Sequence, residues 1–154
     1  MKLRRIFLYV FLSSIILYAS VCTYMYVFQR NFLYHPDKNN YLRSEKLNAD
    51  TKEISVPSTE GIALKAWFYK NPQNKYTVLF FHGNAGGLGN RIYKLNELKN
   101  LNLNYLIISW RGFSGNKGNP TEQGLYSDAR SALEWLEKNN ILKKYPCPLQ
   151  KALI

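Results

Sequence analysis

A short apolar run that opens directly onto a glycine-rich turn constrains the fold more than any other part of the sequence. Residues 76–81 (YTVLFF) are followed at once by residues 82–89 (HGNAGGLG). An apolar run of this length bounded by glycine is typical of a buried strand. Glycine lets the backbone turn tightly and approach a ligand closely, and α/β proteins place ligand chemistry where such a strand ends before a helix. The run therefore predicts a ligand-binding edge of an α/β sheet.

A second apolar segment, near the N-terminus, has the length of a membrane anchor. The residues from Ile6 to Phe28 carry no charged side chain, and Lys2, Arg4 and Arg5 precede them. About 20 apolar residues span a bilayer, and flanking basic residues favour the cytoplasmic side. We expect an uncleaved single-pass anchor in the lipid bilayer, with a cytoplasmic N-terminus and the remaining chain on the opposite side. The alternative is a cleavable signal peptide, which has a shorter apolar core and a small-residue cleavage site.

The basic composition does not indicate a nucleic-acid surface. The chain has 21 Lys and Arg against 10 Asp and Glu, a formal net charge of +11, but no run of more than two basic residues. Nucleic-acid modules gather their basic residues on one face, so we expect no nucleic-acid partner. The two cysteines, Cys22 in the anchor and Cys147 near the end, indicate neither a disulfide framework nor a metal site. We therefore expect no metal and no cofactor.

Beyond the anchor, the pattern predicts an α/β layered sheet. Residues 52–56 and 64–69 flank the turn signal Ser58-Thr59-Glu60-Gly61 and are expected to form an antiparallel hairpin. Two further strands are expected over residues 76–81 and 105–109. The predicted helices cover residues 91–99, with Asn90 as the N-cap, and residues 121–139. The apolar stripe of the second helix is expected to be Leu125, Ala129, Ala132, Leu133 and Leu136.

These elements divide the chain into five parts. They are a basic N-terminus (residues 1–5), the anchor (6–28), a linker (29–50), the layered sheet (51–142) and an unpatterned tail (143–154). The tail contains Pro146 and Pro148, which cannot both occupy a central strand because each removes a backbone donor.

Three chemistries use a glycine loop of this kind. A dinucleotide fingerprint needs a third glycine where this chain has Ile92, and an acidic residue near position 109. A phosphate-binding loop needs a Gly-Lys-Ser/Thr sequence, which does not follow here. The remaining alternative is an oxyanion hole, in which one N–H donor comes from the loop after the third strand and the other from the residue after the nucleophile.

Four segments together resemble the N-terminal half of an α/β-hydrolase, over about residues 29–140. They are most similar to the membrane-anchored serine hydrolases of the bud-emergence type. The segments are Gln29-Arg30-Asn31-Phe32-Leu33-Tyr34-His35-Pro36, Phe81-His82-Gly83-Asn84-Ala85-Gly86, Trp110-Arg111-Gly112-Phe113 and Gly124-Leu125-Tyr126-Ser127-Asp128-Ala129. Their order and spacing match the family, and each of them alone is a weaker signal.

The resemblance implies a fold and a site. The fold is a truncated α/β-hydrolase sheet, an N-terminal hairpin plus two further strands and two helices, behind one N-terminal transmembrane helix. The site is an oxyanion-hole loop formed by Gly83, Asn84, Ala85 and Gly86, with the backbone N–H of Asn84 as the donor. His82 is expected to be structural, bonding a neighbouring carbonyl, and His35 is expected to be a linker residue.

The chain also departs from the family pattern. Ser109 stands where the family usually has an acidic residue, and Ser114 where it usually has glycine. These changes indicate relaxed constraint or a locally different loop. The sequence from Gly112 to Asn116 looks like a nucleophile elbow, but it lacks the final glycine and does not directly follow a strand, so Ser114 is not expected to be a nucleophile.

No G-x-S-x-G motif occurs anywhere in the 154 residues. An oxyanion loop without a nucleophile and base has no acyl transfer to stabilise. We therefore expect no catalytic residues and a truncated, inactive membrane-anchored hydrolase whose ancestral activity was ester or acyl hydrolysis. One alternative is half of a split serine hydrolase completed by a separate C-terminal chain. Another is a membrane-tethered, non-catalytic binding protein.

Overall fold

The computed structural model describes residues 2–37 and 47–142, in two compact units that divide between Tyr34 and His35. The first unit is the helix α1 (Lys2–Leu33), whose apolar side chains are exposed along its length. It is long and apolar enough to cross a membrane, although a signal sequence would meet the same test. Three of its hydroxyl side chains, Ser14, Ser20 and Thr23, donate to backbone carbonyls one turn earlier.

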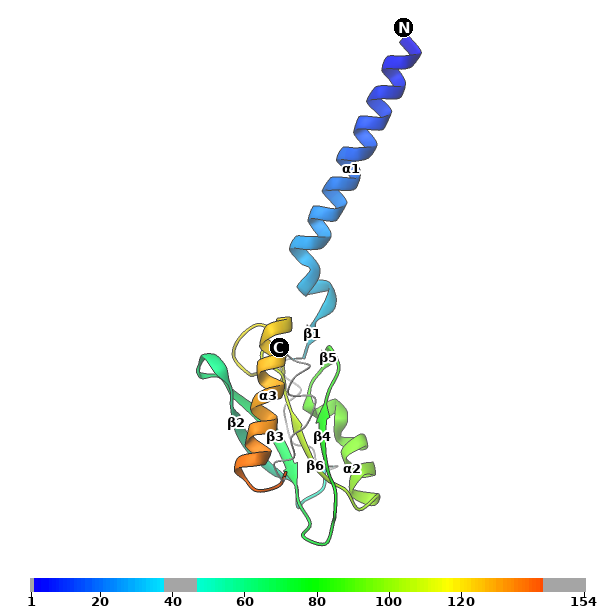
Figure 1. Ribbon diagram of the computed structural model, residues 1–154. Coiled ribbons are helices and arrows are strands. Elements are labelled where there is room, and N and C mark those ends of the chain that lie inside the picture. Colours follow the sequence, from blue (N-terminus) through cyan, green and yellow to red (C-terminus); the bar gives the residue numbers. More distant parts are fainter. Residues whose placement is uncertain (1, 38–46, 143–154) are drawn as a thin grey trace. The chain divides into compact units, whose positions relative to one another are not determined.

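The second unit contains a four-stranded mixed sheet with the order β2-β3-β6-β4 (Figure 1). The strands are β2 (Lys52–Pro57), β3 (Ala63–Tyr69), β4 (Thr77–Phe81) and β6 (Asn104–Ile108). β2 and β3 form the predicted antiparallel hairpin, closed by the 3-10 turn η1 (Thr59–Gly61). β6 lies antiparallel to β3 and parallel to β4. The predicted hairpin and the two further strands are confirmed.

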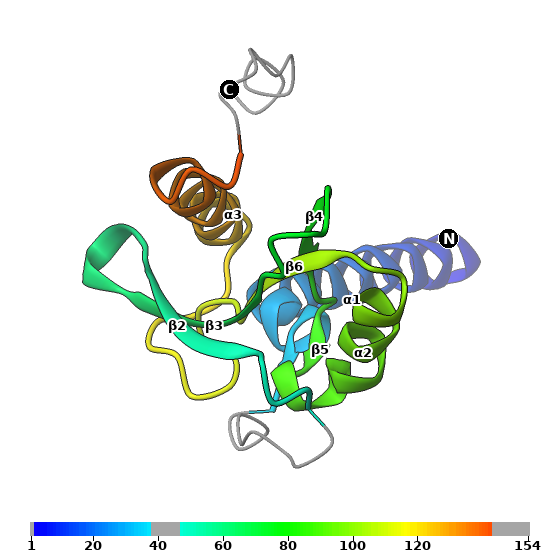
Figure 2. The same ribbon diagram turned by 90° about the horizontal axis from the view of Figure 1, so that it is seen from below.

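Two helices cover opposite faces of this sheet (Figure 2). α2 (Ile92–Asn100) packs over a cluster that includes Trp67, Tyr105 and Ile107. α3 (Glu122–Lys138) packs over the other face, on a cluster that includes Leu64 and Leu106. Since side chains alternate along a strand, the two helices bury both faces, and all five residues of β6 are buried.

The buried face of α3 differs from the predicted stripe. Thr121 caps the helix by accepting the N–H of Gly124 at 3.1 Å, and the buried positions are Gly124, Asp128, Ala132 and Leu136. Ala132 and Leu136 were expected there, but Leu133 is exposed. The difference arises because an aspartate and a glycine face the protein interior, where periodicity alone favours leucine and alanine.

The start of α2 also differs in detail. A 3-10 turn, η2 (Leu88–Arg91), precedes it, and Asn90 belongs to that turn. The amide oxygen of Asn90 accepts the N–H of Gly87 at 2.8 Å, so this side chain caps η2 and the prediction that it caps α2 is wrong. The predicted apolar face is confirmed, since Ile92 and Leu95 are buried and Leu98 packs against the same cluster.

The region predicted as a linker contains regular structure at its start. α1 continues to Leu33, and the following β1 (His35–Pro36) pairs in parallel with β5 (Ala85–Gly86). The predicted linker therefore begins with regular structure over residues 29–36. The loop after β4 offers backbone carbonyls to the N–H groups of His35 and Asp37, which accounts for the extended backbone of β1. The rest of the predicted linker up to residue 46, and the predicted tail, lie outside the described residues.

Candidate active-site loop

The candidate loop, residues 83–86, lies at the carboxyl end of β4, where β5 runs beside β1 (Figure 1). Gly83, Asn84 and Ala85 are exposed, and a Cβ atom placed on Gly83 would meet nothing within 4 Å. By contrast, Gly86 has a φ of +79° and its Cβ would come 2.5 Å from the amide oxygen of Asn90. The fold of this chain therefore requires glycine at position 86, whereas at position 83 it leaves open space.

The carbonyl groups of the loop are held from two directions. The N–H of His35 donates to the Asn84 carbonyl at 2.8 Å, and the N–H of Asp37 donates to the Gly86 carbonyl at 3.0 Å. From the other side, the Arg91 guanidinium donates to the Ala85 carbonyl at 2.8 Å. Fixing these carbonyls fixes their peptide planes and with them the N–H groups of residues 85–87, whereas the Asn84 N–H shares a plane with the Gly83 carbonyl, which bonds His82.

His82, which precedes the loop, is structural. Its Nδ1 bonds the carbonyl of Gly83 at 2.8 Å, and its Nε2 faces the backbone N–H of Trp110 at 3.4 Å. The neutral tautomer with hydrogen on Nδ1 satisfies both contacts, and burial lowers the pKa of His82 to about 4. The predicted bond to a neighbouring carbonyl is confirmed. His35 lies exposed in β1, where its backbone supports the loop.

Trp110 clamps the base of the loop from the neighbouring strand end. Its indole N–H donates to the His82 carbonyl at 2.8 Å, and its ring stacks on Phe81 with centroids 5.1 Å apart. The sequence places Trp110 in a family motif but predicts no role for it. An aromatic residue just after a strand indicates a packing position, but the spacing of Trp110 does not identify the His82 carbonyl as its partner.

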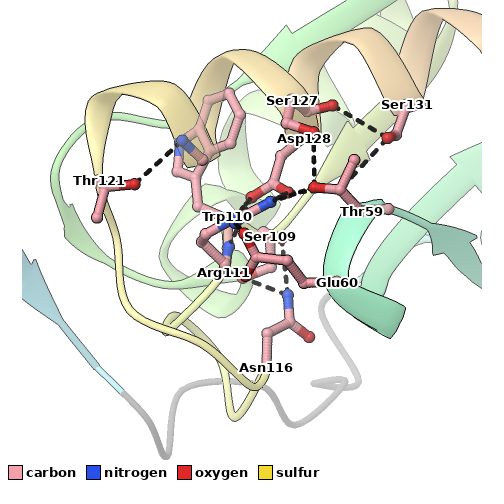
Figure 3. A network of polar contacts seen from close by, with 12 residues as sticks. Thr59, Glu60, Ser109, Trp110, Arg111, Asn116, Thr121, Ser127, Asp128 and Ser131 are labelled. Carbon is pink, nitrogen blue, oxygen red and sulfur yellow. Dashed lines mark hydrogen bonds and ion pairs between the residues drawn. The ribbon is translucent and has the colours of Figure 1, made fainter.

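A buried ion pair anchors the segment that carries Trp110 (Figure 3). The guanidinium of Arg111 contacts the carboxylate of Asp128 at 2.8 Å, and the side chains are 3 % and 0 % exposed. The carboxylate also accepts the N–H of Arg111 and the hydroxyl of Ser58, while Thr59 accepts from the same guanidinium. Hydrogen bonding to Asp128 raises the pKa of Arg111. The pair was missed because its members lie in two separate motifs.

The two serines that depart from the family pattern are both buried. Ser114 has a φ of +49°, so its backbone occupies the left-handed region that favours glycine, and its hydroxyl accepts the N–H of Leu88 at 3.1 Å. That Ser114 is not a nucleophile stays a prediction. The hydroxyl of Ser109 has no hydrogen-bond partner within the described chain, and its carbonyl accepts from Asn116 at 2.7 Å.

Metal-binding residues do not converge in the described ranges. Within residues 2–37 and 47–142, no three His, Cys, Asp or Glu side chains lie close enough together to hold a metal ion.

Known proteins with this arrangement are α/β-hydrolases. An esterase from Pyrococcus furiosus superposes with a TM-score of 0.56 and 16% identity, over 71% of this chain and 42% of that one. An α/β-hydrolase from Vibrio vulnificus gives a TM-score of 0.53 and 17% identity, over 68% of this chain and 39% of that one. The strand order β2-β3-β6-β4 and the glycine loop after β4 are therefore those of the α/β-hydrolase fold.

Sequence relatives narrow the assignment, although no protein-family model matches the chain. Protein bem46 of Schizosaccharomyces pombe is 28% identical over 130 residues, 79% of this chain and 44% of the relative. The α/β-hydrolase domain-containing protein WAV2 of Arabidopsis thaliana is 32% identical over 117 residues, 71% of this chain and 38% of the relative. An uncharacterized protein of Mycobacterium tuberculosis is 32% identical over 120 residues, 77% of this chain and 43% of the relative.

The chain therefore belongs to the α/β-hydrolase superfamily, and within it resembles the N-terminal half of the bud-emergence-type proteins. It spans less than half the length of these curated relatives.

The buried ion pair generates a stability prediction. Replacing Asp128 with alanine leaves the Arg111 guanidinium buried without its counterion, which costs about 3–5 kcal/mol in proteins. The matched control is Glu60→Ala, because Glu60 contacts the same guanidinium at 3.4 Å but is 73 % exposed. Its loss should cost less than about 1 kcal/mol. Denaturant unfolding of the full chain in detergent measures both, and equal costs would contradict the central role of Asp128.

His82 generates a pH prediction. Its pKa is near 6.5 in the unfolded chain and about 4 in the folded one. Below pH 6.5 the unfolded state therefore binds the additional proton, and stability should decrease by roughly 2–3 kcal/mol between pH 7 and pH 4.5. Comparing unfolding curves of the full chain at the two pH values measures this loss.

Two variants separate the His82 contribution from that of the carboxylates. His82→Asn should be less stable at pH 7 but lose this component of the pH dependence. His35→Ala, which alters the chain's only other histidine, should retain it. An unchanged pH profile in His82→Asn would contradict the assignment.

Proposed function

We propose that this chain supplies the oxyanion-binding half of a serine ester hydrolase and is catalytically inactive by itself. The observation that carries the proposal is the exposed loop at residues 83–86, which is held by its carbonyls and leaves open space at Gly83. Acyl transfer develops negative charge on the substrate carbonyl oxygen, and donors already fixed in place stabilise that charge at no reorganisation cost. The backbone N–H of Asn84 is the proposed donor.

The chain lacks the residues that would complete the reaction. It contains no G-x-S-x-G sequence, and the hydroxyl of Ser114, in the segment most like one, is buried and bonded to Leu88. His82 uses both ring nitrogens in backbone contacts and stays neutral, so it is not available as a general base. We therefore propose that the nucleophile, acid and base are supplied by other residues than those of this chain.

We propose that the segment carrying those residues pairs with the open edge of β4. In the described part of the chain, β4 pairs only with β6, yet Leu79 packs toward one core and Phe80 toward the other. A parallel strand with both faces covered is normally an interior strand. We therefore propose that a parallel strand, followed by a helix that covers the stacked rings of Phe81 and Trp110, completes the sheet. A separately encoded C-terminal hydrolase half is one source of that strand.

We also propose that α1 is an uncleaved anchor with its N-terminus in the cytoplasm. Its support is the uncharged apolar stretch within α1 and the three basic residues before it. The full-length chain of 18.0 kDa should remain in the membrane pellet after alkaline extraction, whereas a variant lacking residues 2–28 should be released. Protease added outside sealed spheroplasts should digest the part after α1. A product shortened by about 3 kDa would instead identify a signal peptide.

Complementation tests the catalytic proposal. The full chain is co-expressed with the C-terminal part of a curated relative, beginning where the similarity to this chain ends. Neither polypeptide alone should hydrolyse p-nitrophenyl acetate, and the pair should. Asn84→Pro removes the donor N–H and should lower kcat/KM by about 10²–10³-fold, whereas Asn84→Ala keeps that N–H and should change it little.

The control replaces the nucleophilic serine of the relative's fragment with alanine, which should abolish activity. Activity of this chain alone, or equal activity of the two Asn84 variants, would contradict the proposal. A stable pair without activity would favour the membrane-tethered binding protein.

A further inference from the structure

We infer that residues 35–37, directly after α1, form a strap that positions the candidate oxyanion loop, and that Ser114 holds the strap in place. The inference rests on the proposed function of the loop, but the contacts behind it are independent of catalysis. The strap was predicted as part of a linker, and no active-site role follows from its composition.

The strap contacts the loop through its backbone. The N–H of His35 donates to the Asn84 carbonyl at 2.8 Å and the N–H of Asp37 to the Gly86 carbonyl at 3.0 Å. These two bonds hold the 84–85 and 86–87 peptide groups, and the first of them directly follows the Gly83–Asn84 peptide group that carries the proposed donor N–H. Pro36 sits between them, where its fixed φ favours the extended backbone of a short parallel pair.

Ser114 connects the strap to the opposite end of the loop. Its N–H donates to the carbonyl of Asp37 at 3.2 Å, and its hydroxyl accepts the N–H of Leu88 at 3.1 Å. The residue is fully buried and has a left-handed backbone, which an L-residue other than glycine adopts only when its surroundings determine it. A glycine would adopt this backbone conformation more easily, but the Leu88 N–H would then lose the hydroxyl that accepts its hydrogen bond.

The contacts close into a ring around the loop. The strap bonds the carbonyls of the loop, and the loop continues into η2. The N–H of Leu88, the first residue of η2, bonds the Ser114 hydroxyl, and the Ser114 N–H bonds the Asp37 carbonyl in the strap. Within the ring, Asn90 bonds Gly87 and Arg91 bonds the Ala85 carbonyl. Donors that are fixed before charge develops are what an oxyanion hole requires. Only Tyr34 separates the strap from α1, so the support of the loop is also the covalent connection to the proposed anchor.

Amide hydrogen exchange of the full chain in detergent tests the inference. His35→Pro removes the N–H that bonds the Asn84 carbonyl, and His35→Ala changes the same side chain but keeps that N–H. We expect exchange in the peptide covering residues 83–90 to be roughly fivefold faster in His35→Pro, the effect of losing about one hydrogen bond, and unchanged in His35→Ala. The peptide covering β6 should exchange at the wild-type rate in both variants.

A second variant tests the other end of the ring. Ser114→Gly suits the left-handed backbone and keeps the N–H that bonds Asp37, but removes the hydroxyl. Exchange at Leu88 should rise while the exchange of β6 stays unchanged. Equal exchange rates of the loop peptide in the two His35 variants would contradict the inference that the strap positions the loop. An equal increase in the exchange rate of the β6 peptide would also contradict it. Because exchange requires no substrate, this result is independent of whether complementation yields esterase activity.

Discussion

The buried pair of Arg111 and Asp128 is the interaction on which the arrangement around the candidate loop depends. It joins the segment after β6 to the inner face of α3, and through Ser58 and Thr59 it reaches the turn of the β2–β3 hairpin. Two charges withdrawn from water are stable only when each keeps a partner. The pair therefore fixes three segments that are distant in the sequence, and it explains why a carboxylate replaces an aliphatic side chain on the buried face of α3.

The same segment then organises the loop. Trp110 and Ser114 flank the anchored Arg111 in the sequence, and they bond the His82 carbonyl and the strap respectively. An ion pair on the α3 side of the sheet is thus linked, through a few residues of backbone, to the peptide groups after β4. This connection offers a physical reason why the loop keeps its conformation although Ser114 occupies a position that favours glycine.

The chain combines a supported loop with an open sheet edge within the described residues. Residues 83–86 are held by the strap and by Arg91, whereas the outer edge of β4 has no neighbour in the part that the structure describes. An uncharged edge strand is a surface on which another strand can pair. This combination is what a protein would show if it contributes electrostatic stabilisation to a site whose reactive groups arrive with another segment.

The sequence by itself determined the local elements and the location of the loop. Continuous apolar runs identified β4 and β6, segments on either side of a turn signal identified the hairpin, and apolar residues at helical spacing identified both helices. The glycines after β4 marked the candidate site. Tertiary structure decided which polar groups meet. The predicted apolar stripe omits the buried Asp128, Asn90 is predicted to cap α2 although it caps η2, and His35 is predicted to be a linker residue. Periodicity indicates which face of an element is buried but not which partner that face meets. Hydrogen bonds between distant segments, such as Ser114 with Leu88 and Asp37, form only when the fold brings those segments together.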